Sequence, residues 1–166
     1  MRSALSQAQK EFLEKITPVG RHIQKQLYSG TRVIKPIYSP RGIHASIIIA
    51  EILVSSDWGT HPAISVNNLA LLIAGPYWKG KTVEFDRVKY KSFSDWHEYT
   101  INYTDTVIFT VLYEDVLRCL YHSNQIHLLE FIRTEIPDYY EQIYDTIEKY
   151  ELKEFDLWPV EAEETQ

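Results

Sequence analysis

Residues 45–59 read ASIIIAEILVSSDWG, and this stretch decides the fold. Its apolar residues fall on nearly every side of a helix, which is typical of a helix buried in the centre of a domain. We predict that this helix opens at Ser39-Pro40, runs to about Ser56 and is ended by Trp58-Gly59, because glycine commonly follows a helix. Glu51 stands out as an ionisable residue on an otherwise apolar helix.

The segments on either side indicate a mostly helical α+β domain with a small β-hairpin lobe. Apolar residues recur at three- and four-residue steps before the central helix, whereas apolar and polar residues alternate after it. Before the central helix we predict a helix over residues 5–27, kinked or restarted at Thr17-Pro18, and a loop over 30–40. After it we predict a short helix over 62–72 and a hairpin within 75–90 that turns at Gly80. A helix whose capped start is formed by Ser92 and Asp95 follows, and then helices over 105–121, 123–135 and 137–152.

Length and composition fit one domain. The 166 residues are 45% hydrophobic and 24% charged, with a net charge of −6 that argues against nucleic acid as the main partner. Cys119 is the single cysteine, so no internal disulfide can form. The first residues lack the apolar run of a signal peptide, and no segment is apolar for long enough to span a membrane. We therefore expect a cytoplasmic protein or one exported by another route.

One motif match is rejected on physical grounds. Gly75, Gly80, Lys81 and Thr82 satisfy the phosphate-loop pattern, which requires a helix directly after its last residue. Residues 83–86 alternate like a strand instead, so we interpret the segment as a hairpin. The histidines and the lone cysteine show no metal-ligand spacing, and neither a metal nor a cofactor is implied.

An ordered series of short motifs resembles glycoside hydrolase family 73, the bacterial peptidoglycan β-N-acetylglucosaminidases. In that family a buried helix ends A-Q-A-x-L-E-S-G-W-G and N-N-L follows; here Ala50, Ser56, Trp58-Gly59 and Asn67-Asn68-Leu69 fall in register. The family order continues through residues 75–86, 90–92, 135–143 and 150–156, and the match spans residues 9–157. The resemblance implies a lysozyme-like helical lobe and a β-lobe framing a glycan cleft, as one glucosaminidase-like domain over residues 5–157 followed by a polar tail over 158–166.

The main departure from the family is at its general acid, whose position is occupied by Ser55. A hydroxyl cannot protonate a glycosidic oxygen, so the resemblance implies a catalytically impaired domain. Glu51 lies one helical turn earlier, about 6 Å away on the same face, and either faces the cleft or makes a buried hydrogen bond. If the domain is active, Glu51 is the displaced acid and Glu84 or Asp86, in the expected β-lobe, is its partner.

The resemblance also suggests sugar contacts in the cleft. We expect these from Trp58, Asn68, Tyr77, Trp78 and Tyr139, while Trp96 could fill the groove instead. Three functions remain open. The first is a degenerate domain whose partner is peptidoglycan, another N-acetylglucosamine glycan, or a protein of a cell-wall, phage or secretion assembly. The second is an active glycan hydrolase, and the third is an intracellular protein-interaction domain whose cleft is filled by side chains.

Overall fold

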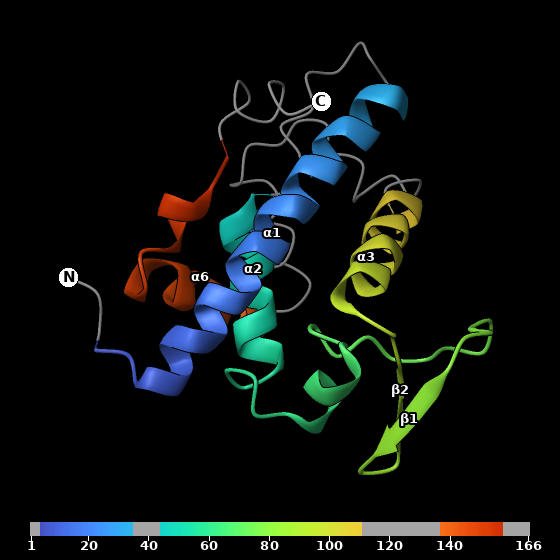
Figure 1. The fold of residues 1–166 in the computed structure, drawn as a ribbon. Helices are drawn as coiled ribbons and strands as arrows, with labels where there is room; N and C mark the ends of the chain where they lie inside the picture. Colours follow the sequence, from blue (N-terminus) through green and yellow to red (C-terminus); the bar gives the residue numbers. More distant parts are fainter. Residues whose placement is uncertain (1–3, 35–43, 111–136, 158–166) are drawn as a thin grey trace.

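The described part of the chain has a central helix with three other α-helices around it and a two-stranded hairpin beside them. This is seen in a computed structural model that describes residues 4–34, 44–110 and 137–157. Helix α2 lies at the centre, α1 crosses it, and α3 and α6 lie on opposite sides of it (Figure 1). The elements are α1 (Gln7–Ile34), α2 (Ala45–Ser55), the 3-10 helix η1 (Pro62–Val66), β1 (Thr82–Phe85), β2 (Val88–Lys91), α3 (Trp96–Thr110), α6 (Pro137–Lys149) and the 3-10 helix η2 (Leu152–Phe155).

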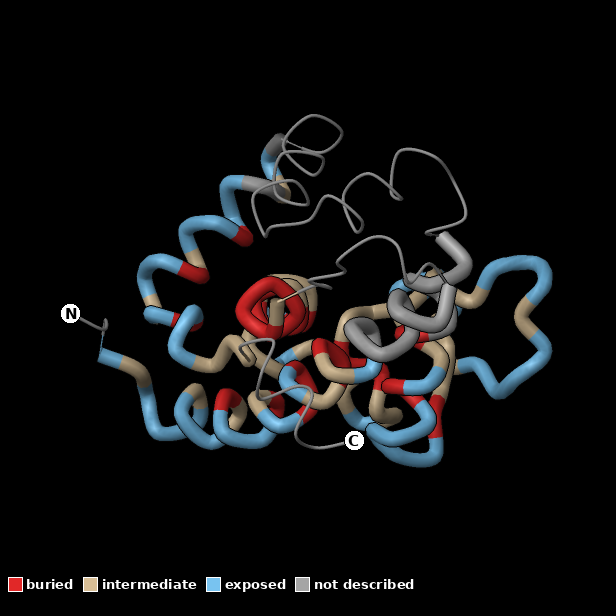
Figure 2. Tube along the Cα trace, turned by 90° about the horizontal axis from the view of Figure 1, so that it is seen from above, coloured by how far each residue is buried: buried red, intermediate tan, exposed pale blue. Residues whose placement is uncertain are grey.

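Helix α2 is the core of the molecule, as the sequence predicts. Eight of its eleven residues are buried, and in Figure 2 the buried residues gather along it at the centre of the view. The predicted start at Ser39-Pro40 is wrong, because the backbone of His44 is extended and the helix begins at Ala45. The predicted end is confirmed within one residue, since the helix stops at Ser55.

Side chains from distant segments fix the start of α2. The Gln24 side chain accepts hydrogen bonds from the amides of Ala45 (3.0 Å) and Leu157 (2.9 Å) and donates one to the Leu157 carbonyl (2.9 Å). Asp156 accepts from the amide and the hydroxyl of Ser46, at 2.7 and 3.0 Å. A carboxylate at the first turn satisfies free amides and favours the positive end of the helix dipole.

Helix α1 runs as a single helix through Pro18 to Ile34, so neither the restart at Thr17-Pro18 nor the loop beginning at residue 30 is correct. The missing proline amide removes one hydrogen bond, but Ile16 and Val19 on either side are buried in the core and hold the helix in place. Its start is a capping box in which Ser6 and Gln9 exchange side-chain-to-amide hydrogen bonds of 3.2 and 3.0 Å.

The backbone takes left-handed conformations directly after α2. Asp57, Trp58 and Gly59 have φ values of 47°, 56° and 81°, and this reverses the chain toward η1. Gly59 is required for a second reason, because a Cβ at that position would lie 2.6 Å from the Phe12 ring. The predicted short helix over residues 62–72 is present only as η1, over Pro62–Val66.

The predicted hairpin is present, but its turn is not at Gly80. Strands β1 and β2 are antiparallel and pair Phe85 with Val88, so the two-residue turn is Asp86-Arg87, both with positive φ. Thr82 opens a strand rather than a helix, which removes the geometry that a phosphate loop needs. A bridge between Ile73 and Tyr90 adds a short third segment to the lobe.

Helix α3 begins after Asp95, whose carboxylate accepts from the Glu98 amide at 2.8 Å. The predicted capping box of Ser92 with Asp95 is therefore wrong. Asp95 itself is the cap, and Glu98 accepts from the amide and the hydroxyl of Ser94. One helix covers residues 96–110, so no separate helix starts at 105. The rest of the helix predicted over 105–121, all of 123–135 and the tail 158–166 lie outside the described residues. Helix α6 begins at Pro137, as predicted.

Candidate functional site

The end of α2 faces the start of α6, and Ser55 meets Tyr139 there. Ser55 is the last residue of α2, and Tyr139 lies in the first turn of α6. The Ser55 side chain lies close enough to the Tyr139 hydroxyl to act against the rise that burial causes in the pKa of Tyr139, and both residues are half-buried. The two residues that the family resemblance aligns with the acid and the cleft tyrosine are therefore neighbours in space.

Glu51 lies one turn before Ser55 and is held by a phenol from α3. The Tyr103 hydroxyl donates to Glu51 Oε2 at 3.1 Å. Burial raises the pKa of Glu51 from 4.5 to about 7, although the hydrogen bond from Tyr103 acts in the opposite direction. The side chain keeps partial access to solvent, since Glu51 is only half-buried. Glu51 thus makes a hydrogen bond to Tyr103, and its exposure to a cleft stays a prediction.

Three tyrosines surround the Glu51 carboxyl. Burial raises the pKa of Tyr99, Tyr103 and Tyr139, and the charge of Glu51 raises each of them further. Tyr99 is fully buried, and the Ala70 backbone beside its hydroxyl acts to lower its pKa, against the larger effect of burial. Tyr99 and Tyr103 were not predicted as site residues. Their spacing of four along α3 was the available signal, because it places both rings on one face.

The other predicted carboxylates, Glu84 and Asp86, lie in the hairpin. Glu84 is exposed on β1, in register with Lys89 across the sheet, and Asp86 is exposed in the turn. Within the described part of the chain, no hydrogen bond joins either of them to Glu51 or Ser55. Their role as partners of an acid stays a prediction.

Two of the aromatic residues expected to contact sugar are engaged with neighbouring side chains. The half-buried Trp58 ring packs edge-on against Tyr150, with centroids 4.7 Å apart. The Trp78 indole donates to the Lys81 carbonyl at 3.0 Å, and the Lys91 ammonium lies 4.6 Å from the centre of its ring.

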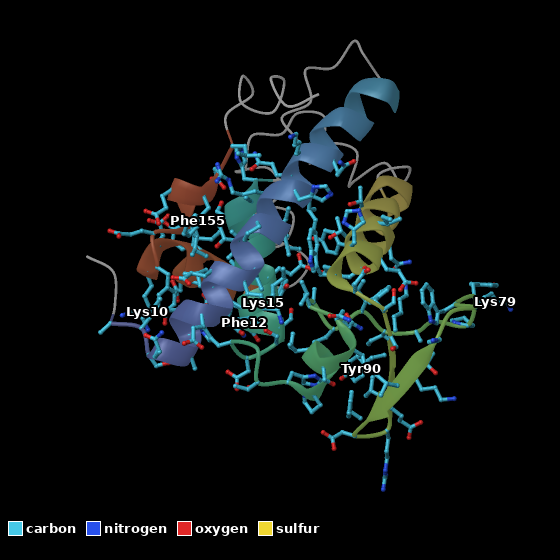
Figure 3. The ribbon with its side chains drawn as sticks, in the orientation of Figure 1. Lys10, Phe12, Lys15, Lys79, Tyr90 and Phe155 are labelled. Carbon is cyan, nitrogen blue, oxygen red and sulfur yellow. The ribbon has the colours of Figure 1, made fainter. Side chains whose placement is uncertain are left out.

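Tyr77 and Asn68 differ sharply in exposure. Tyr77 is 91% exposed and lies in the loop before β1. Lys79, labelled in Figure 3, marks the outer end of this loop. Asn68 is fully buried: its side chain donates to the carbonyls of Leu72 and Lys91 and accepts from the Leu72 amide, at 2.7 to 2.9 Å. These bonds give Asn68 a structural role in anchoring the β-lobe.

Trp96 lies in the first turn of α3. It is 41% exposed and packs edge-on against His22 of α1 and against His97. Within residues 4–34, 44–110 and 137–157, no group of three or more histidine, cysteine or acidic side chains could hold a metal ion. No described helix is long and apolar enough to cross a membrane.

Comparison with solved structures shows which proteins share this fold. The catalytic domain of the autolysin Auto from Listeria monocytogenes superposes with a TM-score of 0.65 at 14% identity, over 93% of this chain and 90% of that one. The peptidoglycan hydrolase from Sphingomonas sp. A1 gives 0.63 at 16%, over 88% and 92%. The glycoside hydrolase domain of Salmonella typhimurium FlgJ gives 0.61 at 16%, over 86% and 88%.

Sequence comparison finds no such match: no family model and no curated protein matches the chain. Identities of 14–16% establish the fold alone. Each superposition covers at least 86% of both chains, so the likeness extends over most of the domain. The chain therefore has the mostly helical, two-lobed fold of peptidoglycan hydrolase domains, as its resemblance to glycoside hydrolase family 73 predicts.

Proposed function

We propose that the chain is a divergent member of this glucosaminidase family that binds cell-wall glycan without hydrolysing it. The observation that carries the proposal is the neutral Ser55–Tyr139 pair at the end of α2. The resemblance aligns the general acid with Ser55, and a serine hydroxyl cannot deliver a proton to a leaving sugar oxygen. The scaffold that would hold a glycan is kept while the acid is absent from its position.

The shared fold supports glycan as the ligand. The proteins that superpose are described as a peptidoglycan hydrolase, an autolysin and a glycoside hydrolase domain, and each is matched over nearly its full length. Half-buried Tyr139 and exposed Tyr77 offer rings of the kind that can lie against a sugar face. A protein of a cell-wall, phage or secretion assembly is the alternative partner and would be expected to compete with glycan.

Co-sedimentation with purified, insoluble peptidoglycan tests binding, and release of reducing ends tests hydrolysis in the same samples. The proposal predicts retention of the protein in the pellet with no new reducing ends. Tyr139→Ala removes one side of the pair and should lower the retained fraction. Thr82→Val, on an exposed strand position, is the matched control and should not. A protein that stays in the supernatant contradicts the proposal.

A second function is favoured by one specific observation, the pKa of about 7 at Glu51. A carboxyl whose pKa lies near neutrality is suited to general acid catalysis, so Glu51 could serve as a displaced acid in an active hydrolase. Tyr103 would then orient the carboxyl. This function requires reducing ends to appear, and it requires their release to disappear in Glu51→Gln.

A further inference from the structure

Residues 75–81, which we call the Tyr77 loop, present an aromatic side chain between positive charges at the outer end of the β-lobe. Tyr77 is 91% exposed, and Lys79 and Lys81 are exposed beside it. Figure 3 shows Lys79 at the end of this loop, on the side of the molecule away from Phe155. An exposed tyrosine offers a partner a large contact area at a low cost in side-chain entropy.

The packing of Trp78 holds the Tyr77 loop in one conformation. The Trp78 indole donates to the Lys81 carbonyl at 3.0 Å, and its ring packs edge-on against Phe93, with centroids 6.0 Å apart. The Lys91 ammonium lies 4.6 Å from the centre of the same ring. A Cβ at Gly80 would lie 2.3 Å from that ring, so the closed loop requires glycine there. A loop that is already ordered loses less entropy when it binds.

The charges of the molecule are divided between two sides. Residues 73–91, in the β-lobe, include five lysine or arginine side chains and two acidic ones, a net charge of +3 in a chain whose net charge is −6. Residues 137–157, which form α6 and η2, include seven acidic side chains and two lysines, a net charge of −5. The hairpin and α6 lie on opposite sides of α2 (Figure 1). Such a molecule is electrostatically complementary to a second copy of itself.

A pocket lies between the end of α2 and α6, on the acidic side. Its volume is about 420 Å³, within the range of about 300–1,000 Å³ for sites that hold small groups, so one aromatic side chain fits its scale. The lining includes Trp58 and Tyr150, whose rings pack edge-on with centroids 4.7 Å apart. Aromatic rings arranged in this way favour contact with another aromatic ring.

The charged groups of this α2–α6 pocket are accessible from solvent. Asp57, Asp145 and Lys149 line it and are all exposed, which gives the lining a net charge of −1. The Thr60 hydroxyl donates to Asp57 Oδ2 at 3.2 Å and helps to fix that carboxylate. The Lys149 ammonium lies 5.2 Å from the centre of the Tyr150 ring. A partner that inserts a ring and places ammonium groups beside the two carboxylates would match this lining.

We propose that the protein associates head to tail with a second copy of itself, with the Tyr77 loop of one copy in the α2–α6 pocket of the next. Tyr77 contacts the Trp58 and Tyr150 rings, and Lys79 lies beside Asp145. Each contact leaves a free loop at one end and a free pocket at the other, so the association is heterologous. One loop in one pocket buries less than about 1,200 Å², which is typical of transient contacts.

Sedimentation velocity of the full chain tests the proposal. At about 0.5 mM protein the sedimentation coefficient should exceed that of the monomer in about 20 mM salt and return toward it in about 500 mM salt. Lys79→Glu and Asp145→Lys, both at exposed positions, should each weaken the association by at least about tenfold, because each places like charges on both sides of the contact. Lys15→Glu makes the same change of charge at an exposed position of α1 and should associate like the wild type.

A mixture of the two weakened variants gives the sharpest result. The negative loop of Lys79→Glu fits the positive pocket of Asp145→Lys, and the unchanged loop of Asp145→Lys fits the unchanged pocket of Lys79→Glu. The equimolar mixture should therefore associate, although neither variant does so alone. A mixture that stays monomeric overturns the proposal, and so does a wild type that is monomeric at about 0.5 mM protein in about 20 mM salt.

A different partner for the Tyr77 loop would also be detected. If the wild type is monomeric but sediments with phosphatidylglycerol vesicles, and Lys79→Glu does not, the loop binds an anionic lipid surface and the proposal fails. The inference does not rest on the proposed function. Tyr77 has a place in both proposals, so it is left unchanged in these tests. Peptidoglycan retention by a monomeric protein leaves only the proposed function standing, whereas self-association without retention leaves only the head-to-tail contact.

Discussion

Replacement of Glu51 by glutamine should change how the stability of the protein depends on pH. The pKa of Glu51 is about 7 in the folded chain against 4.5 as the ordinary value, so the fold favours the protonated carboxyl. The folded state then binds more protons than the unfolded state between those values, and the free energy of unfolding falls as the pH rises from about 4.5 to 7. At 1.36 kcal/mol per pH unit the loss is at most about 3 kcal/mol.

Glutamine keeps the shape and the oxygen that accepts from Tyr103 but cannot ionise. Glu51→Gln should therefore match the wild type at pH 4.5 and exceed its stability by about 1–3 kcal/mol at pH 8, the lower figure allowing for the partial exposure of the side chain. Urea unfolding at pH 4.5, 6 and 8 measures the difference. Glu84→Gln, at an exposed strand position, is the control. Equal differences between Glu51→Gln and wild type at all three pH values would refute the reasoning.

Three further substitutions test the fold around the site. Gly59→Ala should lower the free energy of unfolding by more than about 2 kcal/mol, since φ is +81° and the new Cβ would lie 2.6 Å from Phe12; a smaller loss in thermal unfolding contradicts this. Gln24→Ala leaves the amides of Ala45, at the start of α2, and of Leu157 unpaired, so it should lower the free energy of unfolding by about 2–4 kcal/mol. An unchanged urea midpoint argues against the role given to the Gln24 side chain. Asn68→Ala removes three hydrogen bonds of the β-lobe, so its strand amides should exchange with deuterium faster than those of α2, whereas uniform exchange excludes a local effect.

The central helix could be predicted because its signal is local. A segment that is apolar on all sides must be buried wherever the rest of the chain lies, and α2 is buried as expected. Its first residue could not be predicted, because Ala45 is fixed by Gln24, 21 residues away, and Ser46 by Asp156, 110 residues away. Such contacts leave no pattern in the neighbouring sequence.

The hairpin shows a second limit. Glycine is the usual residue where φ is positive, and for that reason the sequence predicts the turn at Gly80. The chain instead places Asp86 and Arg87 in the left-handed region, where the pairing of Phe85 with Val88 requires it. The register of the two strands decides the turn, and register depends on packing of the lobe rather than on one residue.

The candidate site was predictable in part. The family resemblance brought out Ser55 and Tyr139, which the structure places in contact. The surroundings of Glu51 were not predicted, because Tyr103 comes from a helix 52 residues further along the chain. An ionisable residue on an apolar helix indicated that partners must exist, but only the packing of α3 and α6 against α2 identifies them.

The most direct test of the account is the release of reducing ends from purified peptidoglycan by the full chain between pH 4 and 8. With Ser55 where the acid should be, we predict no release above a protein-free blank at any pH. Release by the wild type that is lost in Glu51→Gln would contradict this result and would show that the acid has moved one turn along α2.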